Sequence, residues 1–328
     1  MKMIFVLLFI VISVISLSAD YGVSKFVNPI CGGADPCVVK NPEGKGYWYV
    51  YSNDAGIYSE YALSPADFKY DFRNKIFEGK PGSEYVKEFW APELIRFGTK
   101  WYIYFTAVNG DNLHQLFVAS GDDPMKPFGD VKCMGSHDND MTIDQSVFEY
   151  KGKLYTVYSG GQGSVEKSRL YIAEMKSPTE IKTAEVAISE PEFEWECHGW
   201  NVNEGPAALQ RNGKLYIVYS ASGAAFDEYC LGLLKFKGGK VTDPANWEKH
   251  PVPVMKGRGN LMGTGHCTFT TDADGNDWCA FHINRPRSAD KQGTWVNRYF
   301  CLQPVVWIDD FPTFSPVVEK PKYFKYEK

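Results

Sequence analysis

One short aromatic segment recurs five times along the chain at nearly regular intervals, and no other feature restricts the possible folds as strongly. The first copy reads Tyr-Trp-Tyr-Val-Tyr-Ser from Tyr47, and the fourth reads Leu-Tyr-Ile-Val-Tyr-Ser from Leu215. The equivalent positions of the five copies are Tyr51, Phe105, Tyr158, Tyr219 and His282. Their spacings are 54, 53, 61 and 63 residues. Self-similarity on this scale indicates a repeat architecture in which each copy forms one supersecondary unit.

Each repeat has the composition of a small antiparallel sheet. Aromatic and β-branched residues favour strands, and each copy follows a tight-turn signal such as Asn212-Gly213. An apolar segment precedes each turn, and a further strand-like run and a proline-containing link follow the aromatic segment. Five such units without helices predict an all-β protein, a five-bladed β-propeller with four-stranded antiparallel blades around a central channel. A β-sandwich or jelly roll is the alternative, but it leaves the equal repeats unexplained.

The N-terminus has the layout of a secretory signal peptide. Lys2 is followed by an apolar run over residues 3–17, and the small residues Ser18 and Ala19 precede the polar Asp20. The run is shorter than the about 20 apolar residues that a membrane-spanning helix needs. We therefore expect a signal peptide over residues 1–19 and a single secreted domain over residues 20–328, without membrane association after cleavage. An uncleaved anchor is the alternative.

The charge balance bears on the partner of the protein. Lys and Arg number 35 against 40 Asp and Glu, the net charge is −5, and the sequence has no basic run. A nucleic-acid-binding surface needs clustered positive charge, so this composition argues against a nucleic-acid partner. The acidic composition fits a neutral substrate better than a polyanion. We also expect the protein to be a monomer.

Eight cysteines follow the expected signal peptide. They are Cys31, Cys37, Cys133, Cys197, Cys230, Cys267, Cys279 and Cys301. An even number of cysteines in an exported chain predicts disulfide bonds, but eight cysteines allow 105 pairings and the sequence does not choose among them. Buried thiols are the alternative for individual residues. The sequence has no C-x-x-C pair, which argues against a structural zinc site.

The start of the first strand in each repeat is where a functional site is expected. First strands line the central channel of a propeller, so the residues at their starts should converge at one channel opening. The residues at this position are Asp35, Ala91, Asp144, Glu204 and His266, which lie 16, 14, 14, 15 and 16 positions before the equivalent aromatic-segment residues. The pattern predicts that three acidic side chains and a histidine meet there.

Clustered carboxyl groups can perform acid–base chemistry. Burial and like charges raise the pKa of one carboxyl group while another stays ionised, which provides an acid and a base at one pH. Glycoside hydrolysis uses such a pair around the scissile bond. Binding of Ca²⁺ is the other use of three carboxylates, but the sequence has no D-x-D-x-D-G loop to support it.

Five short motifs, in order and in phase with the repeats, resemble glycoside hydrolase family 43, a family of five-bladed arabinanases, arabinofuranosidases and xylosidases. The resemblance covers about residues 28–316. The motifs are Ala34-Asp35-Pro36, Trp90-Ala91-Pro92-Glu93, Ile143-Asp144, Glu204-Gly205-Pro206 and Gly263-Thr264-Gly265-His266. The resemblance implies an oligo- or polysaccharide substrate and hydrolysis with inversion of the anomeric configuration.

The resemblance also implies roles for the residues at the predicted channel opening. Asp35 matches the general base that activates water, and Glu204 matches the general acid that protonates the leaving oxygen. Asp144 matches the residue that orients the acid and modulates its pKa. His266 matches a channel histidine that lies near a central ion, often Ca²⁺ bound mainly through water.

Three further residues are expected to bind substrate. Trp90 matches an aromatic residue that packs against the bound sugar, and Arg298 matches an arginine of the last blade that binds sugar hydroxyls. Arg285 and Arg287 are the alternatives to Arg298 for this role. Trp200 shortly precedes Glu204 in the same segment, which makes it a candidate substrate contact.

The leading prediction is an enzyme that removes α-L-arabinofuranosyl units from plant-type pentosans such as arabinan and arabinoxylan. A β-xylosidase or endo-arabinanase would use the same machinery, and a non-catalytic sugar-binding propeller is the alternative from another class. Glu196-Cys197 resembles the acid motif of the invertase-like fructosidases, which retain configuration, but the Asn-Asp-Pro-Asn and Arg-Asp-Pro motifs of that group are absent from the sequence. The set of Asp35, Asp144 and Glu204 favours an enzyme over a sugar-binding propeller, because a lectin does not need all three residues.

Overall fold

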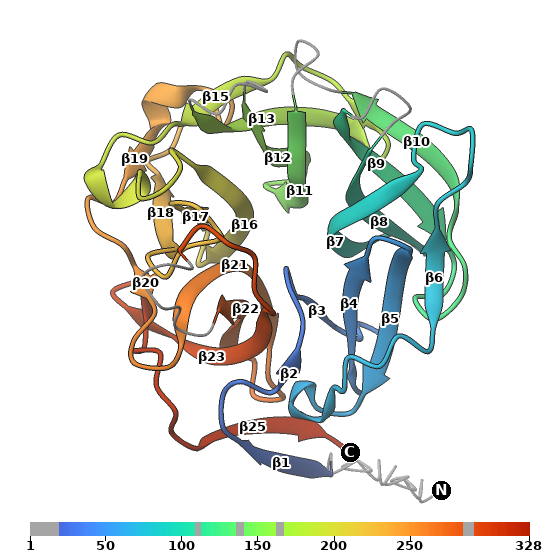
Figure 1. Ribbon diagram of the computed structural model, residues 1–328, viewed down its shortest axis with the longest axis vertical. Helices are drawn as coiled ribbons and strands as arrows, with labels where there is room; N and C mark the ends of the chain where they lie inside the picture. The colour runs from blue at the N-terminus through green and yellow to red at the C-terminus, as the bar shows by residue number, and fades with distance from the viewer. Residues whose placement is uncertain (1–19, 109–112, 136–140, 162–166, 285–291) are drawn as a thin grey trace, which may run out of the picture.

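The structure is a computed structural model that describes residues 20–108, 113–135, 141–161, 167–284 and 292–328. The expected signal peptide lies outside the described residues. Five antiparallel sheets form a ring around a central opening (Figure 1), which confirms the predicted five-bladed β-propeller. In the part of the chain that the structure describes, no helix has the length and apolar character needed to cross a membrane.

Two blades are four-stranded sheets whose strands follow chain order. Blade 1 consists of β3 (Cys37–Lys40), β4 (Tyr47–Asn53), β5 (Gly56–Ala62) and β6 (Lys75–Glu78). Blade 2 consists of β7 (Lys87–Phe97), β8 (Lys100–Val108), β9 (His114–Gly121) and β10 (Gly129–Gly135). The inner strands β3 and β7 lie next to the central opening (Figure 1).

In the other three blades two short strands share the outer position, which makes each sheet five-stranded. Blade 3 consists of β11 (Met141–Tyr150), β12 (Lys153–Gly161) and β13 (Ser168–Ser177), with β14 (Glu180–Ile181) and β15 (Val186–Ser189) outside. Blade 4 consists of β16 (Asn203–Arg211), β17 (Lys214–Ala221) and β18 (Cys230–Phe236), with β19 (Trp247–Lys249) and β20 (Met255–Lys256) outside. Blade 5 consists of β21 (Met262–Thr271), β22 (Asp277–Asn284) and β23 (Tyr299–Ile308), with β24 (Phe311–Phe314) and β2 (Cys31–Gly32) outside. The predicted four-stranded blade is therefore confirmed, and in these three blades the fourth position is shared by two short strands.

Turn residues and caps explain the connections between strands. Asn212 and Gly213, which join β16 to β17, both have a positive φ (49° and 75°), as a two-residue type I′ hairpin requires. Two proline-containing links form the short 3₁₀ helices η1 (Pro65–Asp67) and η4 (Pro244–Asn246), and a third, η3 (Glu194–Glu196), precedes blade 4. The Asp243 side chain caps η4 by accepting the N–H of Ala245.

The N-terminal segment closes the ring. Strand β2 pairs with β23, with Cys31 opposite Phe300, so the first described residues complete the last blade. The rings of Tyr49 in blade 1 and Phe300 in blade 5 stack at 5.1 Å across the same junction. Strands β1 (Tyr21–Phe26) and β25 (Lys322–Glu327) pair outside the ring, next to this junction (Figure 1). Both ends of the described chain therefore fasten the propeller.

The hydrophobic core lies between blades. Trp48 of blade 1 and Trp101 of blade 2 meet edge to face at 4.9 Å, and both side chains are buried. Other clusters join blades 3 and 4, blades 4 and 5, and blades 5 and 1. Large aromatic side chains bury much apolar area each, so one aromatic segment per repeat supplies the contact surface of every blade.

The prediction of disulfide bonds is wrong for this structure. None of the eight cysteines, all of which lie in the described residues, forms a disulfide bond, and five of them, Cys37, Cys230, Cys267, Cys279 and Cys301, are buried. Cys279 and Cys301 lie on neighbouring strands in the apolar cluster between blades 4 and 5, and burial raises the pKa of Cys279. These residues act as small apolar packing residues, as free cysteines commonly do.

Candidate active site

The inner strands share one unusual backbone position near the same end of the channel. The residues there have a positive φ: Asp35 (47°), Ala91 (45°), Asp144 (62°), Gly205 (52°) and His266 (46°). In four blades the strand pairing shifts register next to this position, as it does at a β-bulge that redirects a side chain. Non-glycine residues rarely adopt this conformation, and its repetition indicates a functional site.

The structure corrects two alignments made from the sequence. Gly205, not Glu204, occupies the bulge position of blade 4, and Glu204 pairs regularly with Ser220 one residue earlier. In blade 5 Gly265 pairs with His282, as Glu204 pairs with Ser220 in blade 4. His282 therefore corresponds to Ser220 and not, as the sequence alignment had it, to Tyr219. The sequence alone could not place these residues because a bulge inserts a residue without a change in composition.

The bulges need partners for their backbone N–H groups, and side chains of the preceding blade supply them. The N–H of Asp144 donates to Thr106 Oγ1 (3.2 Å), and that of His266 donates to Ser220 Oγ (2.7 Å). The N–H of Asp35 donates to Nδ1 of His282 (3.2 Å). Each contact links two blades, so the same hydrogen bonds that satisfy the bulges also fix the relative positions of the candidate residues.

Asp35 lies among three basic side chains. Its Oδ1 is 3.0 Å from Arg298 Nη1, 3.2 Å from His282 Nδ1 and 3.4 Å from His266 Nδ1. Burial alone would raise the pKa of Asp35, but the charge of Arg298, together with the nearby His266 and the hydrogen bond to His282, outweighs burial and holds the pKa well below its usual range. Asp35 is therefore ionised, which is the state a general base needs.

Glu204 has the opposite electrostatic environment. Its Oε1 accepts a hydrogen bond from the Tyr229 hydroxyl at 2.7 Å. Burial, with a smaller contribution from the negative charge of Asp35, raises the pKa of Glu204 to about 7, although the Tyr229 hydrogen bond acts in the other direction. Glu204 thus keeps its proton under mildly acidic conditions, as a general acid must.

Asp144 connects the acid to the rest of the site. Its Oδ2 accepts the backbone N–H of Gly205, the residue after Glu204, at 2.9 Å. Burial and the neighbouring charges of Glu204 and Asp35 raise the pKa of Asp144 well above its usual value. The negative charge of Glu204 therefore favours the protonated form of Asp144.

His266 is buried at the centre of the predicted cluster. Its Nδ1 is 3.4 Å from Asp35 Oδ1 and 3.8 Å from Asp144 Oδ2. Burial lowers the pKa of His266, although Asp35 opposes the shift, so the imidazole is neutral at neutral pH. Within the described residues no group of three or more His, Cys, Asp and Glu side chains could hold a metal ion.

Of the three predicted substrate-binding residues, one contacts the cluster directly and the other two pack on aromatic rings outside it. Arg298 reaches the site through its bond to Asp35. Trp90 stacks on His114 with a ring distance of 3.9 Å, and Trp200 packs against Phe226 at 5.8 Å. Arg285 and Arg287, the alternatives to Arg298, lie outside the described residues.

Three contacts were missed from the sequence. His282 could have been found from the sequence. It ends the fifth aromatic segment, and the second, third and fourth copies end in polar residues, Thr106, Ser159 and Ser220. Tyr229 gave no signal, since it lies in an irregular segment before β18 and meets Glu204 only in the folded blade. The stacking of His114 on Trp90 likewise depends on strand pairing.

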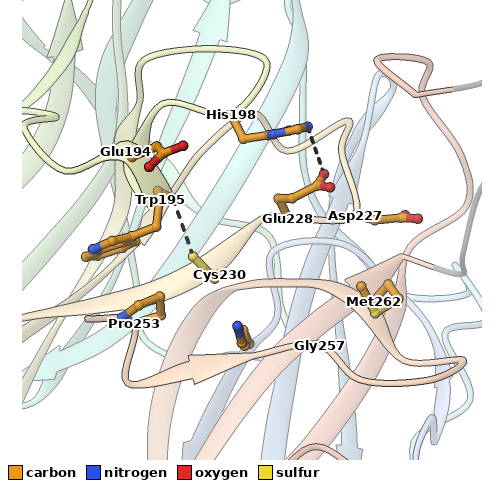
Figure 2. Close-up of a pocket in the computed structure, with 10 residues that line it drawn as sticks. Glu194, Trp195, His198, Asp227, Glu228, Cys230, Pro253, Gly257 and Met262 are labelled. Atoms are coloured by element: carbon orange, nitrogen blue, oxygen red, sulfur yellow. Dashed lines mark hydrogen bonds and ion pairs between the residues drawn. The ribbon is translucent and has the colours of Figure 1, made fainter. Parts of the chain in front are cut away.

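A separate pocket lies away from the channel, between the connections of blade 4 and the start of blade 5. Its volume is about 460 Å³, and its lining includes Trp195, His198, Glu228 and Met262. Figure 2 shows His198 and Glu228 pointing toward each other, with their side chains 3.0 Å apart. The three carboxyl groups of the candidate site are not among its lining residues, so this pocket is not the catalytic centre.

Comparison with known proteins agrees with the geometry. The model of the family described as glycosyl hydrolases family 43 matches residues 26–312. This chain belongs to glycoside hydrolase family 43. The match spans all five blades and includes every candidate residue named above.

Several proteins similar to this family 43 hydrolase are named arabinofuranosidases. It is 31% identical over 266 residues to the extracellular exo-α-(1→5)-L-arabinofuranosidase of Streptomyces chartreusis, which covers 77% of this chain and 80% of that enzyme. It is 33% identical to α-L-arabinofuranosidase 43 of Humicola insolens, over 88% of this chain and 63% of that enzyme. The crystal structure of α-L-arabinofuranosidase from Lactobacillus brevis matches with a TM-score of 0.80 and 29% identity, over 89% of this chain and 97% of that one.

Glu196, which resembled the acid motif of fructosidases, has a structural role in this family 43 hydrolase. Its side chain is fully buried and pairs with Lys249 Nζ at 2.9 Å. The Tyr219 hydroxyl and the Asn203 amide also donate to Glu196 Oε1, both at 2.9 Å. With these partners Glu196 stabilises the segment that leads into Glu204 and does not open to the channel.

The raised pKa of Glu204 predicts a pH-dependent effect on stability. The folded enzyme keeps this proton up to about pH 7, whereas the unfolded chain loses it near the ordinary value of 4.5. The stabilisation is therefore complete below that value and is lost as the pH rises through about 7. Glu204→Gln cannot ionise, so relative to the wild type it should gain up to about 3 kcal/mol between pH 4 and pH 8.

Urea denaturation of both proteins at the two pH values measures this difference. The exposed Glu149→Gln substitution is the matched control and should behave the same at both pH values. A stability difference for Glu204→Gln that does not change with pH would contradict the raised pKa.

Proposed function

We propose that this enzyme is an extracellular α-L-arabinofuranosidase that releases α-L-arabinofuranosyl units from plant-type pentosans with inversion. The mechanism rests on the opposite pKa shifts of two carboxyl groups at one channel opening. The pKa of Asp35 is lowered, so Asp35 is ionised, and the pKa of Glu204 is raised, so Glu204 keeps its proton. The names of relatives at 31% and 33% identity support the sugar. The word extracellular in the name of the Streptomyces relative supports export.

In this proposal Asp35 removes a proton from water. The water oxygen forms the new bond to the anomeric carbon while the bond from that carbon to the leaving oxygen breaks. Glu204 transfers its proton to the leaving oxygen, and exchange with solvent restores both carboxyl groups. The hydrogen-bond partners of the two carboxyl groups fit these different roles. Asp35 contacts the Arg298 cation, whereas Glu204 contacts the neutral Tyr229 hydroxyl.

The neighbouring residues position this pair. Asp144 holds the backbone at Gly205 and thereby orients Glu204, the neighbouring acid. His266 and His282 hold Asp35 from the blade 5 side. Trp90 and Trp200 offer aromatic surfaces to the sugar, and Arg298, with several N–H donors, binds hydroxyl groups in addition to Asp35.

Turnover of defined substrates by Glu204→Gln tests the proposal. Wild-type enzyme should release L-arabinose from arabinan and cleave an aryl α-L-arabinofuranoside faster than an aryl β-D-xyloside. Glu204→Gln should slow arabinan hydrolysis about 10²–10⁴-fold, the usual contribution of general acid catalysis. The loss should be smaller on the aryl arabinofuranoside, because a phenolate leaves with little protonation.

Glu149→Gln serves again as the control and should retain wild-type rates on both substrates. Equal losses for Glu204→Gln on the two substrates would remove Glu204 from the acid role. Faster cleavage of the xyloside would make the enzyme a β-xylosidase, and activity restricted to internal bonds of arabinan would make it an endo-arabinanase.

We also propose that the channel accepts Ca²⁺ near His266, held mainly through water. The described residues offer no direct ligand set of three side chains, and Ca²⁺ prefers oxygen ligands, so the protein fits the ion only through its water shell. The neutral state of His266 leaves a ring nitrogen able to contact the ion or its water.

Chelation tests this ion. If Ca²⁺ binds the folded enzyme, treatment with EDTA should lower the melting temperature, and added Ca²⁺ should restore it, because a ligand of the folded state stabilises by mass action. Added Mg²⁺ is the control and should restore less. A metal-free preparation with an unchanged melting temperature would show that no such ion stabilises the fold.

A further inference from the structure

Three aromatic side chains gather at the rim of the active site, and we call Trp200, Phe226 and Trp295 the aromatic platform. Trp200 precedes β16, Phe226 lies between β17 and β18, and Trp295 lies between β22 and β23. The ring of Trp200 is 5.8 Å from that of Phe226 and 6.0 Å from that of Trp295. Three connections from two blades therefore place their aromatic residues together.

The platform leaves an aromatic surface in water. Trp295 is 63% exposed, more than any other large hydrophobic residue in the described chain. An isolated exposed apolar residue is ordinary, but contiguous apolar surface beside polar groups commonly marks a binding site. Indole rings provide a large flat apolar area with few rotatable bonds, so they bind ligands at a low entropic cost.

The platform is held in place before any ligand binds. A Cβ atom at Gly199 would lie 2.2 Å from the Phe226 ring, and one at Gly223 would lie 2.7 Å from it, so the ring occupies space that glycine leaves free. The N–H of Gly293 donates to Ala225 O at 3.0 Å, which ties the Trp295 connection to the Phe226 connection. Phe226 thus supports Trp200, and a fixed surface binds at less entropic cost than a mobile one.

The platform is linked to both catalytic groups through intervening residues, and the backbone bond from the Tyr229 N–H to Phe226 O (3.4 Å) assigns it to the acid side. The connection that carries Phe226 continues to Tyr229, which hydrogen-bonds to Glu204. The Arg298 guanidinium lies 5.5 Å from the centre of the Trp295 ring and bonds to Asp35. A general acid protonates the leaving oxygen, so surface on its side faces the part of the substrate that departs.

We propose that the platform binds the sugar ring of the leaving group, the pentose that follows the cleaved bond. This inference rests on the proposed function. The apolar C–H face of a pentose packs against Trp295 and Trp200, and the ring oxygens remain free for polar neighbours. The natural substrate is therefore an oligosaccharide or polysaccharide with at least one sugar after the bond that is cleaved.

Two substrates with the same glycone test this assignment. α-(1→5)-L-Arabinotriose carries sugars after the cleaved bond, whereas α-L-arabinofuranosyl fluoride has none. Trp295→Ala should raise KM for arabinotriose about tenfold with kcat little changed, because it removes binding that ground and transition states share. Its kinetics on the fluoride should stay within about twofold of the wild type.

Tyr323→Ala is the control, because Tyr323 is also an exposed aromatic residue (59%) but lies on β25 outside the ring. It should leave both substrates unaffected. Equal losses of kcat/KM on trisaccharide and fluoride would mean that Trp295 acts through Arg298 and Asp35, which overturns the proposal. Unchanged kinetics on both substrates would overturn it as well.

Binding without turnover separates this proposal from the proposed activity. In the Glu204→Gln background, Trp295→Ala should weaken arabinotriose binding about tenfold, measured by calorimetry, and should leave L-arabinose binding unchanged. If the wild-type enzyme fails to cleave arabinofuranosides but this difference in binding is found, the activity assignment fails and the platform stands. If the trisaccharide gains nothing over the monosaccharide, the platform assignment fails.

Discussion

Closure of the ring by the N-terminal segment is the constraint on which the active site depends. Strand β2 completes blade 5 by pairing with β23, and Asp35 follows three residues after β2 ends. The pairing brings Asp35 beside His282 and Arg298, which are 247 and 263 residues away in sequence. The base therefore receives its charge partners only when the propeller is complete, and a chain with an open ring would lose the contacts that keep Asp35 ionised.

The position of one cation among three carboxyl groups explains how one buried site holds two protonation states. Arg298 favours the ionised form of Asp35, Asp144 and Glu204, and among the described contacts of these three carboxyl groups its hydrogen bond goes to Asp35. Burial raises the pKa of Asp144 and Glu204, and the negative charge of Asp35 adds to the effect for both. The bulges make this possible, because each one sends a side chain from a different blade toward the same opening.

The sequence predicted the parts of this structure that repeat and missed those that depend on long-range closure. The aromatic segments predicted five blades, and the phase of Asp35, Asp144 and His266 placed them together correctly. Glu204 was assigned the bulge position that Gly205 occupies, because a one-residue bulge leaves no mark in composition. The disulfide prediction failed because it used cysteine number and compartment, whereas the cysteines form no disulfide bond and the buried ones pack in the apolar clusters between blades. Tyr229, Phe226 and Trp295 lie in connections without a repeat, so no periodic pattern identified them, whereas Trp200 was found from its place shortly before Glu204.

The most direct test concerns the stereochemistry of the first product. With Asp35 as a base that activates water and Glu204 as the acid, attack occurs on the face opposite the leaving group. Proton NMR in the first minutes of aryl α-L-arabinofuranoside hydrolysis should therefore show β-L-arabinofuranose before mutarotation, and Asp35→Asn should abolish its formation. An initial product of retained α configuration would make Asp35 a nucleophile and contradict the assignment of acid and base.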